Sequence, residues 1–577
     1  MRRKRWIRCE QDPDRRERIS EGLGVSPIVA QILINRGVRE MEDARKFLDV
    51  SPKDLHSPFL LKEMDRAVDR ILQAMSRGER ILIYGDYDVD GVTASSLYLQ
   101  FFRSQGIDAD HYIPYRMTEG YGLNVAAMET VRERGAAVII TADCGTTSVR
   151  EIDRARELGM DVIVTDHHEP SSELPKSYAL LNPHRKDASY PFKGLTGVGV
   201  ALKLVQGILM REPGDSEFPP VLHDYLDLVT LGTIADVAPL TGENRFFVKE
   251  GLRRLTEERR PGVAALKKVA GLSGAEAGVG MVGFALGPRI NAAGRLSRAD
   301  DGVRLLTTRD MGEALEIAGR MDAVNRERQR IEEGIRKEAR ERVLQELDPG
   351  KEGAIVLGSA AWHPGVIGIV ASKIAEEFYR PTVLIAVGAD GMGKGSARSI
   401  PGFHLYEALD QCRPLLEAFG GHQYAAGLTI REENIPVLRD RFSGIARDTL
   451  REEDFIPRLK IDMEVDLDGI NFAMLKEMEL LSPFGMANPE PVLASRGLRV
   501  ASPRVLGKGH LKMRVHQGGT SVDTIGFQMA ESCREFTTDT RAVDMAYTPE
   551  LNLWKGTYGL QLRMKDLRWS GSDYDHC

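Results

Sequence analysis

Two hydrophobic patterns alternate along residues 80 to 170. Short apolar runs of strand length at 81–83, 137–141 and 162–165 are separated by segments with the apolar spacing of helices, at 92–103 and 149–158. Strands that alternate with helices predict a doubly wound parallel sheet of the α/β class, with right-handed crossovers. In such a fold, ligands bind outside the carboxyl ends of the strands. The residues that follow each strand are therefore the candidates for chemistry.

The second half of the chain predicts three further parts. Residues 308–347 are charged, lack proline and carry an apolar residue at every fourth position, so we expect a long, mostly solvated helix that connects two lobes. Strand-like segments at 354–357 and 383–387 flank a helical segment at 366–378 and predict a smaller α/β domain. After residue 454, short segments separated by turn signals predict a β-barrel.

The N-terminal residues show no targeting signal. A helical pattern covers residues 28–47, and the basic run 2–5 is expected to be a solvated, disordered terminus in preference to a phosphate-binding arm. Charged residues follow where a signal peptide would be apolar, and no apolar run has the length of a membrane span. We expect a cytoplasmic protein without a membrane association.

Composition limits the class of protein but does not identify it. A length of 577 residues predicts about three or four domains. The five cysteines are scattered without a CxxC pair, which indicates a reducing compartment with neither disulfides nor a zinc ribbon. The net charge of -7 does not by itself suggest nucleic acid, but basic residues can cluster locally.

Acidic residues and histidines follow each predicted strand of the first sheet, and a further aspartate follows a predicted helix that ends just before Pro239. Because the carboxyl ends of parallel strands share one edge of a sheet, we expect these groups to lie together. A carboxylate at a helix C-terminus opposes the helix dipole, so the last one is either exposed or compensated by a cation. The candidates are Asp86, Asp88, Asp90, Asp143, Asp166, His167, His168 and Asp236.

The pattern of Asp86, Asp88 and Asp90 is also compatible with two other kinds of site. An EF-hand calcium loop requires Glu at its twelfth position, where this chain has Leu97, and a helix before the loop, where this chain has a strand. A solvated aspartate-rich turn remains the other alternative. Clustered carboxylates repel one another, so a divalent cation is the simplest way to keep them all ionised.

The donor set favours particular metals. Oxygen ligands select Mg²⁺ or Mn²⁺ over Zn²⁺, and an imidazole shifts the preference toward Mn²⁺. Four or five carboxylates exceed the charge of one divalent ion, so two ions are expected, and a two-metal site indicates phosphoester hydrolysis. Cys144 follows Asp143 but is expected to be a small buried residue and not a ligand.

Several glycine-rich and basic segments are candidates for phosphate or strand binding. Glycines permit close approach and arginines bind phosphate, although tight turns and packing segments have the same composition. Such segments cover 278–295, 391–400 and 419–427. Basic residues without an acid between 496 and 517, with nearby aromatic residues, fit a strand-binding barrel face or, equally, a solvated one. These residues are Arg496, Arg499, Arg504, Lys508, Lys512, Arg514, Phe527, Tyr547, Trp554 and Tyr558.

The motifs resemble those of a known superfamily. DYDVDG, TADCG, TDHH and LGTIADVAPL resemble, in that order, the four motifs of the DHH phosphoesterases, and FGGHQYAAG resembles the signature of their associated second domain. With GFALGPRINAAGR, GSARSI and a C-terminal barrel, the chain is similar to the RecJ family of bacterial single-strand DNA exonucleases. The resemblance extends from about residue 60 to the end and implies five parts: an N-terminal segment (1–58), a DHH catalytic domain (59–307), a connecting helix (308–348), a DHH-associated domain (349–453) and an OB-like nucleic-acid-binding domain (454–577).

The resemblance also implies a reaction and site residues. It implies 5′ to 3′ hydrolysis of single-stranded DNA to mononucleotides, in DNA repair and recombination, with two Mn²⁺ ions, or Mg²⁺. By position in the motifs, the metal ligands are Asp88, Asp90, Asp143, His167 and Asp236, with Asp86 and His168 beside them. The implied DNA contacts are Arg116, Arg289, Arg295, Ser396, Arg398 and His422. The polarity follows from the family and from no residue of the chain.

Two alternatives and several partners accompany this interpretation. The chain could instead be a phosphodiesterase for short oligonucleotides or cyclic dinucleotides, or a pyrophosphatase, but those substrates do not need a barrel. A non-catalytic DNA-binding scaffold would be expected to lack metal ligands, whereas every motif position is filled here. The family suggests a single-strand-binding protein and a RecQ-type helicase as partners, and we expect a monomer.

Overall fold

The computed structural model describes residues 4–115, 119–120, 122–211, 217–296, 299–347, 352–507, 509–532, 541–554 and 557–571. The chain forms two compact units, one made of residues 8–324 with 461–572 and the other centred on residues 325–460. Within the described residues, none of the helices has the length and apolarity needed to cross a membrane.

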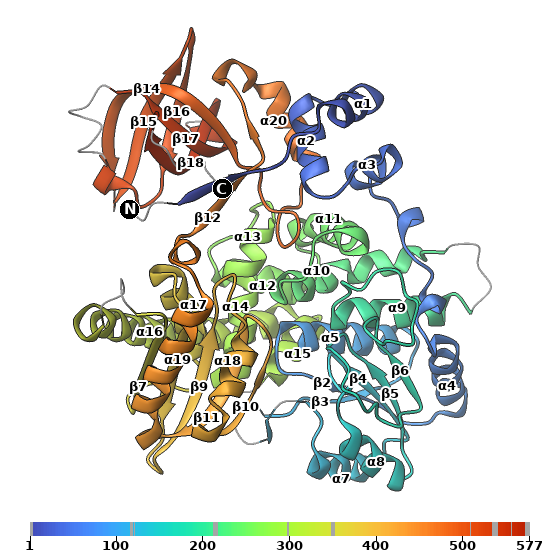
Figure 1. Cartoon of the computed structure of the whole chain (residues 1–577). Coiled ribbons are helices and arrows are strands. Elements are labelled where there is room, and N and C mark those ends of the chain that lie inside the picture. Colours follow the sequence, from blue (N-terminus) through green and yellow to red (C-terminus); the bar gives the residue numbers. More distant parts are fainter. Residues whose placement is uncertain are drawn as a thin grey trace. The chain divides into compact units, whose positions relative to one another are not determined.

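A five-stranded parallel sheet forms the centre of residues 59–324, called the catalytic half below after the resemblance noted above (Figure 1). Its order is β3-β2-β4-β5-β6, so the strand order reverses between β2 and β4, as in other doubly wound folds. The predicted parallel sheet is confirmed, and two shorter strands are added to it. The strands are β2 (Ile81–Gly85), β3 (Asp110–Tyr112), β4 (Val138–Ala142), β5 (Asp161–Thr165) and β6 (Ala179–Leu181).

Helices cover both faces of this sheet. Alternate strand residues such as Ile83 and Ile140 pack with α4 (Met64–Arg77), α5 (Val89–Ser104) and α9 (Gly197–Leu209). Their neighbours along the strands, such as Leu82 and Ile139, pack with α7 (Val125–Glu133) and α8 (Val149–Glu157). Strands buried on both faces explain why the strand sequences are continuously apolar.

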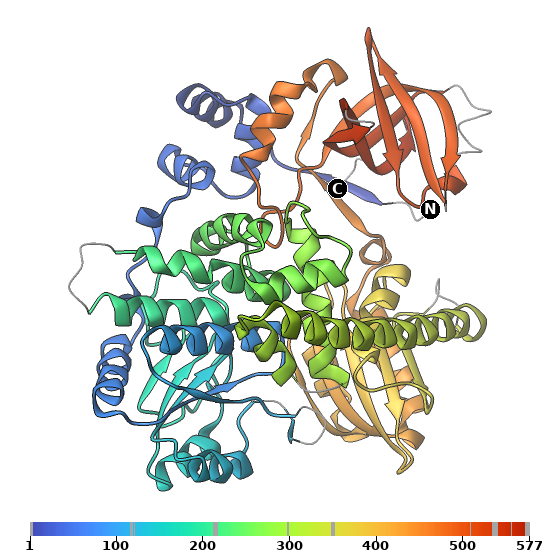
Figure 2. The ribbon, with the colours of Figure 1, turned by 180° about the vertical axis from the view of Figure 1, so that it is seen from behind.

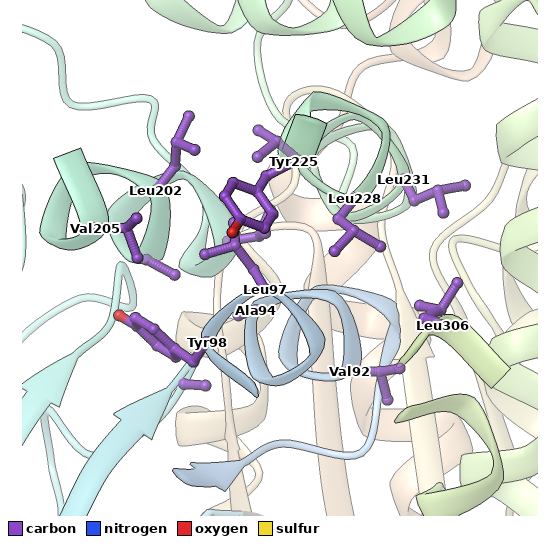
Figure 3. Packing of buried hydrophobic residues seen from close by; sticks show 14 of the residues in the cluster. Val92, Ala94, Leu97, Tyr98, Leu202, Val205, Tyr225, Leu228, Leu231 and Leu306 are labelled. Carbon is purple, nitrogen blue, oxygen red and sulfur yellow. The ribbon is translucent and has the colours of Figure 1, made fainter. Parts of the chain in front are cut away.

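Helix α5 is buried along most of its length. Figure 3 shows its residues Val92, Leu97 and Tyr98 among side chains of α9, α10 and α15. These contacts fix both ends of α5 in one core. The remaining helices of this layer are α10 (Leu226–Ala235), α11 (Gly242–Glu257), α12 (Pro261–Val269), α13 (Val279–Met281), α14 (Gly287–Leu296) and α15 (Asp300–Thr307), with a π-helical turn at Val282–Leu286.

The long connecting helix exists but is not mainly solvated. Helix α16 (Met311–Glu346) is continuous (Figure 2). Its first turns bury Ile317 and Met321 in the catalytic core. Its last turns bury Ala339 and Val343 against the second α/β domain. The expectation of a solvent-laced connector is therefore wrong, because the apolar stripe packs into a different core at each end.

The second unit is a smaller α/β domain, as expected. Its sheet has the order β10-β11-β9-β8-β7, in which only β7 and β8 are parallel. Most of the glycine-rich segment at 391–400 is a strand. Gly393 and Gly395 within it leave room for the side chains of Ile385 and Leu428 on the neighbouring strands. The elements are β7 (Ile355–Ser359), α17 (Ile367–Phe378), β8 (Thr382–Val387), β9 (Met392–Arg398), α18 (Leu405–Gln411), β10 (Leu416–Gly421), β11 (Ala425–Arg431) and α19 (Ile435–Thr449).

The C-terminal part is a closed barrel, which confirms the prediction. Five strands run in the order β14-β15-β16-β18-β17, and pairing of β14 with β17 closes the sheet. They are β14 (Leu493–Leu506), β15 (His510–Gln517), β16 (Thr520–Gly526), β17 (Val543–Trp554) and β18 (Thr557–Trp569), preceded by β12 (Arg458–Ile461), β13 (Met463–Glu464) and α20 (Phe472–Glu479).

The basic face of the barrel is partly neutralised. Arg496 pairs with Glu464, and Arg514 pairs with Asp523, both from neighbouring strands. Tyr547 is fully buried in the barrel core, so its expected place on a binding face is wrong. Phe527 and Tyr558 are exposed, whereas Lys508 and the Trp554 side chain lie outside the described residues.

The N-terminal helices complete the barrel's core. Ile32 and Leu33 pack in one cluster with Leu467, Met474 and other barrel residues. The helical pattern at 28–47 is two helices and not one, because Gly37 adopts a left-handed conformation between them. The helices are α1 (Pro13–Leu23), α2 (Pro27–Asn35) and α3 (Met41–Leu48).

The basic terminus is also ordered in part. Arg5 begins strand β1 (Arg5–Arg8), which pairs with β12, and its guanidinium bonds Glu453 at 2.9 Å. The expectation of a disordered terminus is therefore wrong for Arg5. Arg2 and Arg3 lie outside the described residues.

Candidate metal centre

The centre of the site lies where the strand order reverses. Asp86 follows β2 and donates its backbone N–H to the Ala142 carbonyl at 3.1 Å. Asp143 follows β4 and donates to the Thr165 carbonyl at 3.1 Å. Both side chains are buried. The two adjacent central strands therefore deliver one carboxylate each to the position where a doubly wound fold binds its ligand.

Helix α5 brings two further carboxylates to this edge. Asp88 is the N-cap of α5 and accepts hydrogen bonds from the backbone of Asp90 and Gly91 at 2.9 and 3.1 Å. Asp90, in the first turn, accepts from the backbone of Gly197 and Val198 at 2.6 and 3.0 Å. These donors form the start of α9, so the positive ends of two helices stabilise the negative charge.

Backbone geometry and a missing side chain place Asp143. Its φ of 67° is left-handed, a conformation that aspartate tolerates better than most residues. A Cβ atom built on Gly197 would lie 2.5 Å from the Asp143 Cβ and 2.7 Å from its Oδ1. A Cβ on Gly232 would similarly lie 2.5 Å from the Asp90 Oδ1. Glycine at both positions therefore permits the two carboxylates to approach.

Asp166 organises the TDHH segment from behind. Its carboxylate accepts from the backbone of His167 at 2.7 Å and of Thr146 at 2.9 Å. It also bonds the His168 Nδ1 at 2.7 Å. Burial acts to raise the pKa of Asp166, but these bonds, above all that of His168, lower it below its ordinary value. The structure therefore gives Asp166 a supporting position, away from the cluster.

The His167 ring points its Nε2 into the carboxylates. This atom lies 3.1 Å from the Asp143 Oδ1, 3.7 Å from the Asp90 Oδ2 and 3.8 Å from the Asp236 Oδ2. It is buried and accepts no hydrogen bond from the described residues. Burial lowers the pKa of His167 to about 4, so its lone pair is available at neutral pH.

These separations fit a shared cation. Two ligands that each lie about 2.1 Å from one ion at right angles are about 3 Å apart. Asp236 reaches the cluster as the C-cap of α10, which confirms its expected place at a helix end. Three overlapping groups have ligand atoms within 4.8 Å of one another: Asp143, His167 and His168; Asp90, His167 and Asp236; and Asp86, Asp88 and Asp143.

The electrostatics of the cluster also require positive charge. Burial, and then the neighbouring charges of Asp236 and Asp88, raise the pKa of Asp90 well above its ordinary value. Burial and the charge of Asp90 do the same to Asp143. Burial and Asp88 raise the pKa of Asp236 to about 7. A divalent cation would restore ionisation of all three, so the donor set fits the expected Mn²⁺ or Mg²⁺.

His168 differs from His167 in charge. Burial acts to lower the pKa of His168, but its hydrogen bond to Asp166 outweighs burial and raises the pKa to about 9. Its side chain is 42% exposed, whereas that of His167 is 16% exposed. His168 is thus a cation at the partly exposed rim of the cluster.

In the second unit, the predicted phosphate-binding residues Ser396 and Arg398 lie on β9, and His422 lies in the turn between β10 and β11. Arg398 on β9 donates to the hydroxyls of Ser396 at 3.0 Å and Ser372 at 3.1 Å. None of the described acidic residues lies within ion-pair distance of its guanidinium, and burial lowers its pKa. His422 is exposed, and its backbone N–H donates to the Ala425 carbonyl at 2.8 Å. Ala425 on β11 lies opposite Arg398 on β9. A half-buried guanidinium between hydroxyls is suited to an anion.

The other predicted DNA contacts are three arginines of the first domain. Arg289 on α14 is held by Asp322 at 2.9 Å and by the Ala285 carbonyl at 2.7 Å. Arg295 lies in the last turn of the same helix, and Arg116 lies outside the described residues. A Cβ on Gly294 would be 2.4 Å from the Tyr87 carbonyl oxygen, so the glycine-rich helix packs tightly on the loop that carries Asp86 and Asp88.

Four supporting residues were missed by the sequence reasoning. Asn291 accepts the Val89 N–H at 3.2 Å, and Asn182 donates to the Thr146 hydroxyl and the His168 carbonyl at 2.8 Å. Gly197 and Gly232 provide space for carboxylates. The local signal was the presence of glycines in the apolar helices α9 and α10, which is unfavourable unless close packing requires it.

Comparisons with known proteins agree with this arrangement. Family models match at residues 80–233 (DHH family, N-terminal domain), 351–448 (DHHA1 domain) and 461–566 (RecJ OB domain). The chain is 42% identical over 566 residues to the single-stranded-DNA-specific exonuclease RecJ of Bacillus subtilis, covering 97% of this chain and 70% of that protein.

Solved structures give the same result. The crystal structure of RecJ from Thermus thermophilus with Mn²⁺ matches with a TM-score of 0.82 and 32% identity, covering 98% of this chain and 79% of that one. The structure of the same protein with Mg²⁺ matches with a TM-score of 0.77 and 30% identity, over 98% and 78%. The chain therefore belongs to the RecJ family of single-stranded-DNA-specific exonucleases.

Proposed function

We propose that this chain releases mononucleotides from the 5′ end of single-stranded DNA, in DNA repair and recombination. Its family membership gives the reaction class, metal-dependent hydrolysis of DNA phosphodiesters by an exonuclease. The observation that carries the proposal is the convergence of Asp90, Asp143 and Asp236 on the neutral His167 ring at the strand-order reversal. The 5′ to 3′ direction is an inference from the family.

Five residues are proposed to hold two metal ions: Asp88, Asp90, Asp143, His167 and Asp236. Bound Mn²⁺ or Mg²⁺ would lower the pKa of a water and neutralise charge on the leaving oxygen. Asp90, His167 and Asp236 form one ligand group, and Asp88 and Asp143 belong to another, which supports two ions and not one. Asp86 is proposed to lie behind these ligands and orient them.

Other residues of the chain are proposed to bind and orient the DNA. The charged His168 at the rim would contact the scissile phosphate, and Asp166 would keep its ring oriented. Ser396, Arg398 and His422 would bind a strand phosphate on the second domain. Arg116 and Arg295 are proposed to join them, and Arg289 would do so only on leaving Asp322. We propose the domain division 1–58, 59–307, 308–348, 349–453 and 454–577.

The barrel supports a long substrate. Exposed Phe527 and Tyr558 offer stacking surfaces for bases. Arg499 and Arg504 are exposed basic residues on β14, and none of the described acidic side chains lies within ion-pair distance of either. A phosphodiesterase for dinucleotides would not use these groups, and a scaffold would not need the filled metal cluster. We propose a monomer that acts on chromosomal DNA in the cytoplasm, with a single-strand-binding protein and a RecQ-type helicase as partners.

The deciding experiment is metal-dependent release of mononucleotides from an end-labelled single strand. A 5′-phosphorylated strand is compared with one whose 5′ end is blocked, with Mn²⁺, with Mg²⁺ and with a chelator. We expect loss of the 5′ label first, and suppression by the block. Asp143→Asn should abolish release, whereas Asp187→Asn, an exposed aspartate outside the cluster, should not. Release from the 3′ end first would refute the direction, and full activity of Asp143→Asn would refute the ligand assignment.

A further inference from the structure

A cavity of about 420 Å³ lies in the catalytic half, and none of the residues of the metal cluster line it. Four segments meet around it: the end of α5, the start of α10, the link between α11 and α12, and the end of α15. Five arginines line it, against two aspartates. The arginines are Arg103, Arg254, Arg259, Arg260 and Arg309.

Three of these arginines are neutralised by acidic neighbours. Arg260 bonds both oxygens of Asp227, at 2.6 and 2.9 Å, and its remaining N–H groups bond Gln100 and backbone carbonyls. Arg254 lies 3.5 Å from Asp224, and Arg259 lies 2.8 Å from Glu257. Arg260 is therefore a fixed part of the wall.

The other two arginines provide unbalanced charge. Arg103 donates to the Thr307 carbonyl at 3.2 Å, and none of the described acidic residues lies within ion-pair distance of Arg103 or Arg309. Both side chains are exposed at the mouth of the cavity. The nine-residue helix α12 also begins on this wall at Pro261, and no side chain caps its first turn. Its first residue is a proline, which has no N–H, and Gly262 and Val263 behind it are buried, so the unbalanced charge at this cavity comes from the two arginines.

The cavity stands at the far ends of helices that carry the metal centre. Helix α5 has Asp88 as its N-cap and Arg103 in its last turn, and its 16 residues span about 24 Å. Helix α10 begins beside Asp227 and ends at its C-cap Asp236. Figure 3 shows Leu97 of α5 and Leu228 of α10 in one packed core. The cavity is thus separate from the metal centre but connected to it through the core that α5 and α10 share.

We propose that this cavity is a binding site for a phosphate-bearing anion of nucleotide size. Arg103 and Arg309 would bind the phosphate, because guanidinium groups are among the usual phosphate donors in proteins. Val221 and Pro261 give the cavity an apolar wall that suits the remainder of a nucleotide. The phosphate can belong to a free nucleotide or to a DNA strand, since both present the same group.

The test is a calorimetric titration of the full-length protein with a chelator present, so that metal-dependent binding at the catalytic cluster is removed. The probes are inorganic pyrophosphate, dAMP and a short single-stranded oligonucleotide. Arg103→Gln with Arg309→Gln removes the two unbalanced charges. The matched control is Arg156→Gln with Arg330→Gln, which removes two exposed arginines that are paired with acids away from the cavity.

We expect the cavity variant to bind pyrophosphate more weakly by about tenfold for each arginine removed. The control variant should bind as the unmodified protein does. Loss of dAMP binding alone would identify a free nucleotide as the source, and loss of oligonucleotide binding as well would identify the strand. Equal affinity of the cavity and control variants, or no saturable binding of any probe to the unmodified protein, would overturn the proposal. Matching melting temperatures of the two variants would exclude misfolding.

Discussion

Gly197→Ala should inactivate the enzyme without removing a single ligand. The added Cβ would lie 2.5 Å from the Asp143 Cβ and 2.8 Å from its Cγ, whereas ordinary contacts are 3.4 to 4 Å. Asp143 must therefore move by about 1 Å, and a misplacement of that size costs a catalytic site about 100-fold in rate. Gly197 lies in helix α9 and does not have a left-handed φ, so its backbone conformation would not strain an alanine.

Gly199→Ala is the matched control for this substitution. It lies two residues further along the same helix, and its added Cβ meets only Leu195 and Thr196 side chains, at 3.3 Å or more. Both substitutions gain about 1 kcal/mol of helix propensity, so propensity cancels in the comparison. The difference between the two variants then reports only the contact with Asp143.

The assay is the initial rate of mononucleotide release across a Mn²⁺ titration, with thermal melting measured in parallel. We expect Gly197→Ala to lose about 100-fold in rate and to need more Mn²⁺, while Gly199→Ala stays within a few-fold of the unmodified enzyme. If the two variants turn over alike, Asp143 is not held against Gly197, and the close-packing argument is refuted. If Gly197→Ala melts far below Gly199→Ala, the loss reflects folding.

Three further predictions address charge. Without metal, the protein should gain on the order of 1–2 kcal/mol of stability as the pH falls from about 9 to 6.5, as measured by denaturant unfolding. The pKa of His168 is about 9 in the folded protein and 6.5 in the unfolded one, and that of Asp236 is about 7 against 3.8, so over this range both groups bind protons mainly in the folded state. Partial exposure of the two side chains reduces the effect. Below 6.5, His167 opposes this gain because its pKa is lowered to about 4; a flat profile from 9 to 6.5 would contradict both assignments. Arg398→Ala should raise KM for a 5′-phosphorylated strand about tenfold, and Lys394→Ala, which bonds Thr429 on the adjacent strand, should not; equal KM values would place the phosphate elsewhere. Arg499→Gln with Arg504→Gln should lower the salt dependence of DNA binding by about two phosphate contacts, and an unchanged slope in a filter-binding titration would mean a merely solvated face.

The last of these replaces a simpler experiment. Deleting the residues after about 455 would remove the barrel in one step. The structure shows that Leu467, Met474 and other barrel residues share a core with Ile32 and Leu33 of the N-terminal helices. Deletion would expose that core, so a loss of binding would not distinguish lost contacts from misfolding. Surface substitutions avoid this ambiguity.

Local patterns predicted the sheet and the positions of its ligands. Periodicity located β2, β4 and β5, and parallel topology then brought Asp86, Asp143 and His167 to one edge without any further information. Periodicity does not separate the roles of Asp166 and His167, because both follow the same strand; the motif resemblance makes His167 a ligand and gives Asp166 no role. Only the contacts of Asp166 with Thr146 and His168 show that it supports the site from behind.

What the sequence did not predict depends on contacts between distant residues. Gly197 bonds Asp90 across 107 residues, and no local pattern records such a pairing. The basic stretch of the barrel looked unopposed because Glu464 and Asp523 stand outside it in sequence but beside it in space. Tyr547 alternates into the core because strand register, which composition does not reveal, decides which face each residue takes.

The shared core of the first and last parts of the chain has a consequence for biosynthesis. Ser26, at the start of α2, bonds Glu477 of α20 across 451 residues. At 5–20 residues per second, a ribosome takes roughly 20 to 90 s to make the intervening chain. The catalytic domain can fold in that interval, while Ile32 and Leu33 wait with their apolar partners still unmade. The N-terminal helices, although translated first, therefore complete their packing last, and they are the segment that a chaperone would have to protect on the nascent chain.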